Sequence, residues 1–210
     1  TAVKMADKLT NLYVQSAGKI YNGSNIRDII YTWISNAEEL NSLQRVAENL
    51  NDGRDALSYN YILKNDIDAS GLVNAANSTY NTIGSGTKAF TGTFDGDGHT
   101  IVGLQAKGGI FGKLGSGAVV KNINIASSVF TGKNTDSVGA VAAENNGGSI
   151  SGISSYGNTI KGSGGYIGGL VGKNYGGISN SNDHSTVIAG ADTVAGGIAG
   201  VNGTKAGIVG

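Results

Sequence analysis

The feature that most constrains this chain is a short motif that recurs at a nearly constant spacing. Its copies begin at Gly108, Gly139, Gly168 and Gly196, which are 31, 29 and 28 residues apart. The copies read GGIFGKL, GAVAAEN, GGLVGKN and GGIAGVN, so small residues precede a short apolar run in each. A repeat of roughly 20–50 residues is typical of architectures in which one repeat forms one unit and similar units stack.

Each repeat also carries two further short apolar segments, separated by glycine, asparagine and serine. The second segments lie at 118–125, 149–153 and 177–178, and the third at 129–130, 159–160 and 187–188. Three short strands in a repeat of about 30 residues are typical of one coil of a parallel β-helix. The sequence therefore predicts a mainly β fold, a right-handed parallel β-helix (β-solenoid), with a short partly helical N-terminal segment.

The chain divides into two regions at about residue 57. Residues 57–210 form the predicted β-solenoid, which we expect to be truncated within a repeat at the C-terminus. Residues 1–56 form a predicted N-terminal linker or cap segment with a helix at about 37–50. Ser35 or Asn36 suits the start of that helix, because a small polar side chain can accept a hydrogen bond from its first turn.

Composition limits both the fold and the partners. Glycine supplies 36 of the 210 residues, far above the usual share of about 7%, yet without the period of collagen. There is no cysteine, which excludes disulfides and thiolate metal sites. The 15 basic and 15 acidic residues cancel, which argues against binding nucleic acid through a basic face. No apolar run approaches the roughly 20 residues of a membrane-spanning helix.

The recurring positions of the motif are predicted to have structural roles. Glycine beside a strand lets backbones approach closely and lets the chain bend. Asparagine at one repeat position tolerates the left-handed backbone conformation of a corner, and stacked amides can form a hydrogen-bonded ladder. The structural repeat positions are Gly139, Gly168, Gly169, Leu170, Gly172, Asn145, Asn174, Gly196, Gly197 and Asn202.

Residues 167–181, IGGLVGKNYGGISNS, are similar to the GLUG repeat, named for its Gly-Leu-hydrophobic-Gly core. The preceding segment, 61–104, resembles a module that often comes before such repeats. The copies at Gly139 and Gly196 depart from the pattern through alanine at the large apolar position, and the first copy has Leu114 in place of the asparagine. The resemblance covers about residues 59–210.

GLUG repeats occur in large bacterial surface and secreted proteins, including filamentous-haemagglutinin-like adhesins and the N-terminal regions of some IgA-cleaving metalloproteases. The resemblance therefore implies a secreted or cell-surface location and a non-enzymatic stalk or adhesive module. It carries over no catalytic residue and no cofactor. The expected partner is a host cell-surface, matrix or glycan ligand, and an exposed coil could also support self-association into a filament.

One string of residues suggests a metal site. Asp95 and Asp97 stand in the sequence DGDGH, and two carboxylates among glycines could ligate Ca²⁺. The EF-hand pattern is not completed, because no further acidic ligand closes the loop. Asp-Gly is also a common turn dipeptide, so a turn is the favoured interpretation.

A carbohydrate-active enzyme is the main alternative, because polysaccharide lyases share the β-helix architecture. Their chemistry needs clustered carboxylates, whereas those after residue 100 fall at different phases of the repeat: Asp136, Glu144, Asp183 and Asp192. His99 and His184 do not form a metalloprotease motif, and we expect both to be solvated. Trp33 is predicted to lie in the core rather than in a sugar-binding platform.

Overall fold

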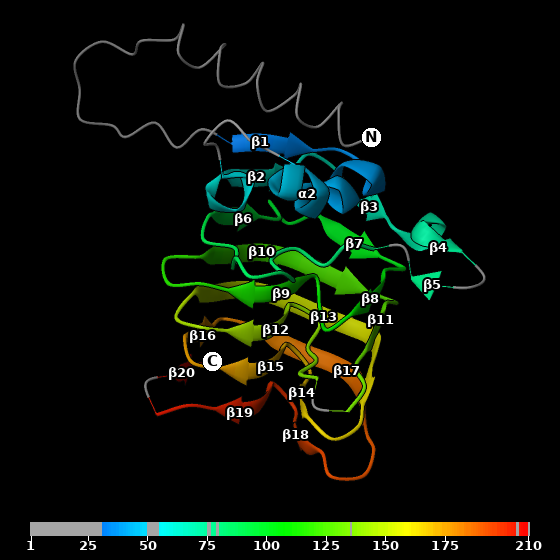
Figure 1. The fold of residues 1–210 in the computed structure, drawn as a ribbon, viewed down its shortest axis with the longest axis vertical. Coiled ribbons are helices and arrows are strands. Elements are labelled where there is room, and N and C mark those ends of the chain that lie inside the picture. Colours follow the sequence, from blue (N-terminus) through cyan, green and yellow to red (C-terminus); the bar gives the residue numbers. More distant parts are fainter. Residues whose placement is uncertain are drawn as a thin grey trace, which may run out of the picture.

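The computed structural model describes residues 31–49, 55–74, 77–78, 80–134, 136–204 and 206–209. Within them the chain forms a parallel β-solenoid of about six turns, whose coils stack along the long axis in Figure 1. This confirms the predicted fold class. Residues 1–30 and 50–54, most of the predicted N-terminal segment, lie outside the described residues.

The larger parallel sheet runs the length of the stack and has twelve strands. They are β1 (Tyr31–Ile34), β2 (Asn60–Leu63), β3 (Ile67–Asp68), β6 (Thr93–Asp95), β7 (Thr100–Val102), β8 (Gln105–Lys107), β10 (Val119–Ala126), β11 (Val129–Thr131), β13 (Ser149–Gly162), β16 (Gly177–Ser179), β17 (Asn182–Ala189) and β20 (Gly207–Val209). The longest of them, β13, pairs with strands of the coils on both sides, so one continuous strand joins three coils.

The second parallel sheet consists of the motif that the sequence repeats. Its order is β19-β15-β12-β9, and its strands are β9 (Phe111–Leu114), β12 (Ala142–Asn145), β15 (Val171–Asn174) and β19 (Ala199–Asn202). Register partners along this sheet occupy the same place in each copy: Phe111, Ala142, Val171 and Ala199. The repeat in the sequence is therefore the coil of the solenoid.

Smaller elements complete the coils. Strands β14 (Tyr166–Gly168) and β18 (Val194–Gly196) form a parallel pair, and β4 (Val73–Asn74) and β5 (Asn77–Ser78) form an antiparallel pair. The 3₁₀ turns η1 (Ala56–Ser58) and η2 (Ser70–Leu72) lie between strands of the first coils. The β4–β5 pair projects from the side of the stack (Figure 1).

Helix α2 (Ala37–Asn49) lies against the first coils (Figure 1), close to the predicted range 37–50. Asn36 is its N-cap, because the Asn36 side chain accepts a hydrogen bond from the Glu39 N–H at 2.9 Å. The Glu39 carboxylate in turn accepts from the Ser35 N–H at 2.8 Å, one residue before the N-cap, which ties the first turn to the chain that enters the helix. Leu40 and Leu43 are buried in the core as their spacing predicts.

The sheet crosses the boundary predicted at residue 57. Strand β1, from the segment expected to precede the solenoid, pairs in parallel with β2 from Tyr31 through Ile34. Strand β2 pairs in turn with β6 on the next coil. The stacked sheet therefore begins upstream of residue 57. In the sequence, α2 lies between the paired strands β1 and β2.

Aromatic rings fill the interior near α2. The Phe90 and Phe111 ring centroids are 5.1 Å apart, and those of Phe94 and Phe111 are 5.4 Å apart in an edge-to-face arrangement. Edge-to-face contacts of this kind add to the free energy gained by burying the rings. Farther along the stack the interior is built mainly from isoleucine, valine and alanine.

Trp33 does not lie in the core, contrary to the prediction. Its side chain is half exposed, and the Lys64 Nζ lies 4.3 Å from the ring centroid. The reason is the alternation of a strand: Thr32 and Ile34 on β1 face inward, so Trp33 between them faces outward. The lysine covers the exposed ring through a cation–π contact.

Stacked left-handed residues turn the chain at the corners. Asn122, Gly152 and Asn180 follow the register partners Lys121, Ser151 and Ser179, and all three have positive φ, at 54°, 64° and 46°. A second row at another corner has φ values of 73°, 48° and 63° and consists of Gly103, Ser127 and Gly157. Much of the glycine and asparagine content therefore serves corners, where an ordinary side chain would be strained.

Candidate functional site

A groove of about 530 Å³ opens where the coils of β9 and β12 meet the segment 80–85 and helix α2. Small polar side chains line one side of it: Asn81, Thr82, Ser85 and Ser137. Charged side chains line it as well: Lys107, Lys113, Asp136 and Glu144. Its volume lies within the range of roughly 300–1,000 Å³ that is typical of small-molecule sites.

Helix α2 fixes the wall of this groove through polar side chains on the face beside its apolar stripe. The Asn41 Oδ1 accepts a hydrogen bond from the Asn81 N–H at 2.7 Å, and the Gln44 Oε1 accepts from the Gly84 N–H at 2.8 Å. Asn41 and Gln44 are both buried. On the opposite side, the Thr82 hydroxyl donates to the Lys107 carbonyl at 2.9 Å. The segment 80–85 is thus tied to both the helix and the coil.

Small residues form part of the floor of the groove. Gly108, Gly112 and Ala143 line it, and Ala143 occupies the place in the β12 motif that Gly112 has in β9. A Cβ atom at Gly112 would lie only 2.9 Å from the Ser85 Cα, so glycine is needed for the wall segment to pass. The Ser85 backbone therefore packs directly against Gly112, and none of these three floor residues has a side chain longer than a methyl group.

Two charged side chains of the groove, Lys113 and Glu144, belong to a row that crosses three coils. Lys113, Glu144 and Lys173 are register partners on β9, β12 and β15. The Lys173 Nζ lies 3.1 Å from the Glu144 Oε1 and 5.1 Å from the Tyr166 ring centroid. Within the described residues, neither Lys107 nor Lys113 has an ion-pair partner. Two ammonium groups of the groove therefore make no ion pair with the described residues.

Ser137 is the one side chain with a buried, unused polar atom in the described part of the chain. Its hydroxyl is buried and makes no hydrogen bond there. Leaving a buried polar group unsatisfied costs about 1–3 kcal/mol, so such an atom in a groove points to an external partner. The neighbouring Asp136 carboxylate accepts from the Lys133 N–H at 2.9 Å, which holds this turn in place.

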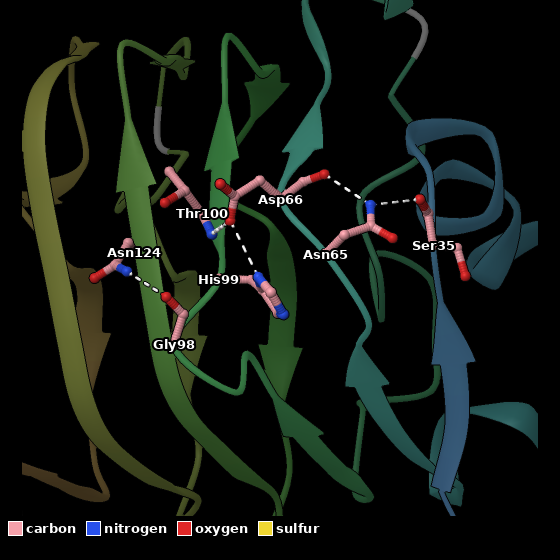
Figure 2. A network of polar contacts seen from close by, with 7 residues as sticks. All are labelled: Ser35, Asn65, Asp66, Gly98, His99, Thr100 and Asn124. Atoms are coloured by element: carbon pink, nitrogen blue, oxygen red, sulfur yellow. Dashed lines mark hydrogen bonds and ion pairs between the residues drawn. The ribbon is translucent and has the colours of Figure 1, made fainter.

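A second polar cluster runs across the coils on the larger sheet, and Figure 2 shows it. The Asp66 Oδ1 accepts from the Thr100 N–H at 2.9 Å and lies 3.2 Å from the His99 Nδ1 on the next coil. The hydrogen bond from Thr100, followed by that from His99, holds the pKa of the Asp66 carboxyl below its usual value. His99 is thus an inter-coil partner of a carboxylate, whereas the sequence predicted a solvated side chain.

Asparagine side chains extend this cluster in both directions (Figure 2). The Asn65 amide donates to the Ser35 carbonyl at 2.8 Å on one side. The Asn124 amide donates to the Gly98 carbonyl at 2.7 Å on the other. The cluster links successive coils along the stack. Its side chains form their hydrogen bonds with the backbone or with neighbouring side chains.

The DGDGH segment forms a turn whose first carboxylate binds protein groups. The Asp95 Oδ1 accepts from the Asp97 N–H at 2.9 Å and the Asn122 amide at 3.2 Å, and the Asp95 Oδ2 lies 3.0 Å from the Lys121 Nζ. Burial raises the pKa of Asp95, but these hydrogen bonds outweigh it, so the pKa lies below its usual value. Both Asp95 carboxylate oxygens therefore already have protein partners.

The asparagines of the motif form a ladder inside the solenoid. The Asn145 amide donates to the Asn174 Oδ1 at 2.9 Å, and the Asn174 amide donates to the Asn202 Oδ1 at 2.7 Å. The Asn145 Oδ1 also accepts from the Gly148 N–H at 2.8 Å, so the amide closes the turn after its strand. The left-handed conformation expected at these residues is absent, because each ends a strand in extended conformation.

Another buried amide, that of Asn158, lies outside the repeat pattern. Its Oδ1 accepts from the Ser128 N–H at 2.9 Å, and its Nδ2 donates to the Ile125 carbonyl at 2.9 Å and to the Ser155 hydroxyl at 3.0 Å. It sits at the irregularity between Tyr156 and Thr159, where β13 shifts register against β17. A single asparagine outside the repeat pattern cannot be distinguished from a turn residue in the sequence.

The four carboxylates after residue 100 do not form one cluster. Asp136 and Glu144 lie at the groove, whereas the Asp183 carboxylate accepts from the Ser185 hydroxyl at 2.6 Å and Asp192 takes a corner position with φ of 54°. Across the described ranges, no three metal-ligating side chains gather. No described helix combines the length and apolar composition that a bilayer crossing requires.

Comparisons with known proteins give limited matches. No family model matches the chain. Halomucin from Haloquadratum walsbyi is 35% identical over an alignment of 129 residues, and the match covers 56% of this chain and 1% of halomucin. The chain thus spans about 1% of the length of that curated relative. A solved structure from Bacteroides ovatus, described as a candidate immunoglobulin A1 protease, has a TM-score of 0.42 and 18% identity, covering 92% of this chain and 78% of that one.

Proposed function

We propose that this chain is a non-enzymatic structural and adhesive segment of a large extracellular protein, secreted or displayed on a bacterial surface. The observation that carries the proposal is the use of its carboxylates. Asp66, Asp95 and Glu144 each bind a basic side chain of the adjacent coil, namely His99, Lys121 and Lys173. These carboxylates pair with neighbouring coils and, among the described residues, do not converge on one centre.

Two further observations support the surface location. The match to halomucin, by its name a mucin-type protein, covers more than half of this chain. The copy at Gly168 follows the GLUG pattern in sequence, the other three resemble it with departures, and we propose that all four are GLUG-type repeats. A solenoid of such repeats suits a stalk, because coils add length without changing the cross-section.

Binding of the full 210-residue chain to intact cells, extracellular matrix and immobilised glycans tests the adhesive part. We expect saturable binding to at least one of these surfaces, and none after thermal unfolding of the chain. The carbohydrate-active enzyme is tested in parallel with a panel of polysaccharides. Release of reducing ends or unsaturated uronates would overturn the non-enzymatic proposal.

Self-association into a filament stays a prediction. Its test is sedimentation of the full chain over a range of concentrations. Growth in mass with concentration would favour a filament subunit over an adhesive segment that acts singly.

A further inference from the structure

We propose that the groove between α2 and the β9–β12 coils binds an anionic sugar unit, a ring that carries a carboxylate or sulfate, at the end or branch of an oligosaccharide. This proposal rests on the adhesive function proposed above and names its ligand class. It follows from four properties of the groove: its lining, its charge, its floor and its one unsatisfied hydroxyl.

The lining favours a polyhydroxylated ligand. Small-molecule sites are usually lined mainly by apolar and aromatic side chains. Here the side chains are amides, hydroxyls and charged groups, with Asn81, Ser85 and Asp136 among them. The accessible surface of the groove also includes an apolar share somewhat larger than the polar one, and a sugar ring, with hydroxyls at its edge and C–H groups on its faces, can contact both.

The charge favours an anion. The Glu144 carboxylate is compensated by Lys173. The described residues provide no ion-pair partner for Lys107, Lys113 or Asp136, and two ammonium groups against one carboxylate leave a net positive charge in the groove. An ammonium group binds a carboxylate or sulfate through charge-assisted hydrogen bonds, which are about twice as strong as neutral ones. The two lysines line the same groove and can act on one anionic group.

The floor and the buried hydroxyl complete the site. Gly108, Gly112 and Ala143 bring no side chain longer than a methyl group to the floor of the groove. The Ser137 hydroxyl has hydrogen-bonding capacity that no described protein group uses. A sugar hydroxyl can both donate and accept, so it can satisfy that serine whichever role the serine takes.

The test is a calorimetric or NMR titration of the full chain with a uronic acid disaccharide, N-acetylneuraminic acid, a sulfated disaccharide and neutral lactose. We expect one or more of the three anionic probes to bind, lactose to bind much more weakly, and added salt to weaken binding. Comparison of the carboxylated and sulfated probes identifies the anionic group. Lactose that binds as well as every anionic probe would overturn the proposal.

Variants locate the binding in the groove. The double variant Lys107→Gln/Lys113→Gln is expected to lose about tenfold or more in affinity, because charge-assisted hydrogen bonds are removed. Ala143→Leu is expected to abolish binding by filling the floor. Lys64→Gln, which removes an exposed lysine beside Trp33, is the matched control and should bind like the wild type. Wild-type affinity in the double variant would contradict the site.

Ser137→Ala separates a ligand partner from a structural role. The variant removes an unsatisfied buried hydroxyl, so we expect equal or higher thermal stability together with about fivefold weaker sugar binding. Lower stability with unchanged affinity would show that the hydroxyl serves the fold and would remove it from the site.

The cell-binding experiment keeps the two proposals apart. If the chain adheres to cells while no anionic probe titrates, the groove proposal fails and the adhesive function stands. If an anionic probe binds and is lost in the double variant but no cell, matrix or glycan surface is bound, the adhesive function fails and the groove stands.

Discussion

The two ends of the solenoid differ in how completely its interior is covered. Beside α2, the inward-facing Ile34 is fully buried, and so is Leu40 on the helix. At the far end, the register partners Ile150, Ile178 and Ile208 have exposed fractions of 0%, 2% and 43%. The same residue type in the same place of successive coils is thus buried or exposed according to whether a further element covers it.

Whether a side chain in a solenoid is buried therefore depends on whether coils or other elements lie on both sides of its own coil. Each coil contacts only the coils beside it, so its stability is the sum of its own terms and two interfaces. The coils around β10 and β13 have both interfaces, whereas β20 pairs with β16 alone in the described residues. Substitutions at equivalent positions should therefore have different effects along the stack.

The largest expected difference concerns the isoleucine row. Ile150→Ala should lower the free energy of unfolding by about 2–5 kcal/mol, because it leaves a cavity between two coils. Ile208→Ala should cost less than about 1 kcal/mol, since much of that side chain is already in water. Urea unfolding of both variants measures the difference, and equal losses would contradict dependence on neighbours.

In the asparagine ladder, too, an inner substitution should lower stability more than one at the exposed end, but the difference should be smaller. Asn174→Ala breaks bonds to Asn145 and Asn202 and leaves the Gly176 groups without their amide partner. We expect a loss of about 1–3 kcal/mol, the cost of unsatisfied buried groups. Asn202→Ala, at the exposed end of the ladder, should lose less. Thermal unfolding is the measurement, and a larger loss for Asn202→Ala would reverse the comparison.

The third prediction concerns pH. Because the pKa of Asp95 is lowered in the folded protein, the ionised carboxylate contributes stability above its unfolded pKa of about 3.9. That contribution is lost as pH falls through the folded pKa. Asp95→Asn should therefore be less stable than the wild type at pH 7, on the order of 1 kcal/mol, and the difference should narrow as the solution is acidified. A difference that stayed constant with pH would contradict the ionic role.

The smallest effect is expected in the row of charged side chains formed by Lys113, Glu144 and Lys173. Glu144→Gln removes the ion pair with Lys173, whose two side chains are both partly exposed. Exposed pairs contribute about 0–1 kcal/mol, so the loss should lie in that range and shrink further at high salt. Chemical unfolding at two salt concentrations measures it. A loss as large as that of Asn174→Ala would mean that the row is structural.

The coil and its strands could be predicted because their signal is local and repeats. The spacing of Gly108, Gly139, Gly168 and Gly196 corresponds to the register of β9, β12, β15 and β19. The stacked corner residues with positive φ could not be predicted from the repeat, because their backbone conformation repeats while their residue type does not. Asn122 and Gly152 differ as letters but meet the same requirement for positive φ.

The groove and the inter-coil pairs could not be predicted, because their partners are distant in sequence and belong to no repeat. Asn41 binds Asn81 across 40 residues, and Asp66 meets His99 across 33. Gln44 looked like an ordinary polar residue on the outer face of a helix. Only the fold brings it to Gly84 and so shapes the wall of the groove.

The single-file stacking of coils has a mechanical consequence. A coil peeled from the stack shortens the folded rod by one strand spacing, about 4.8 Å. The same event releases about 30 residues, which extend to on the order of 100 Å when pulled straight. Under tension the solenoid would therefore lengthen in discrete steps, each far longer than the layer of the stack that is lost. Each step would absorb mechanical work.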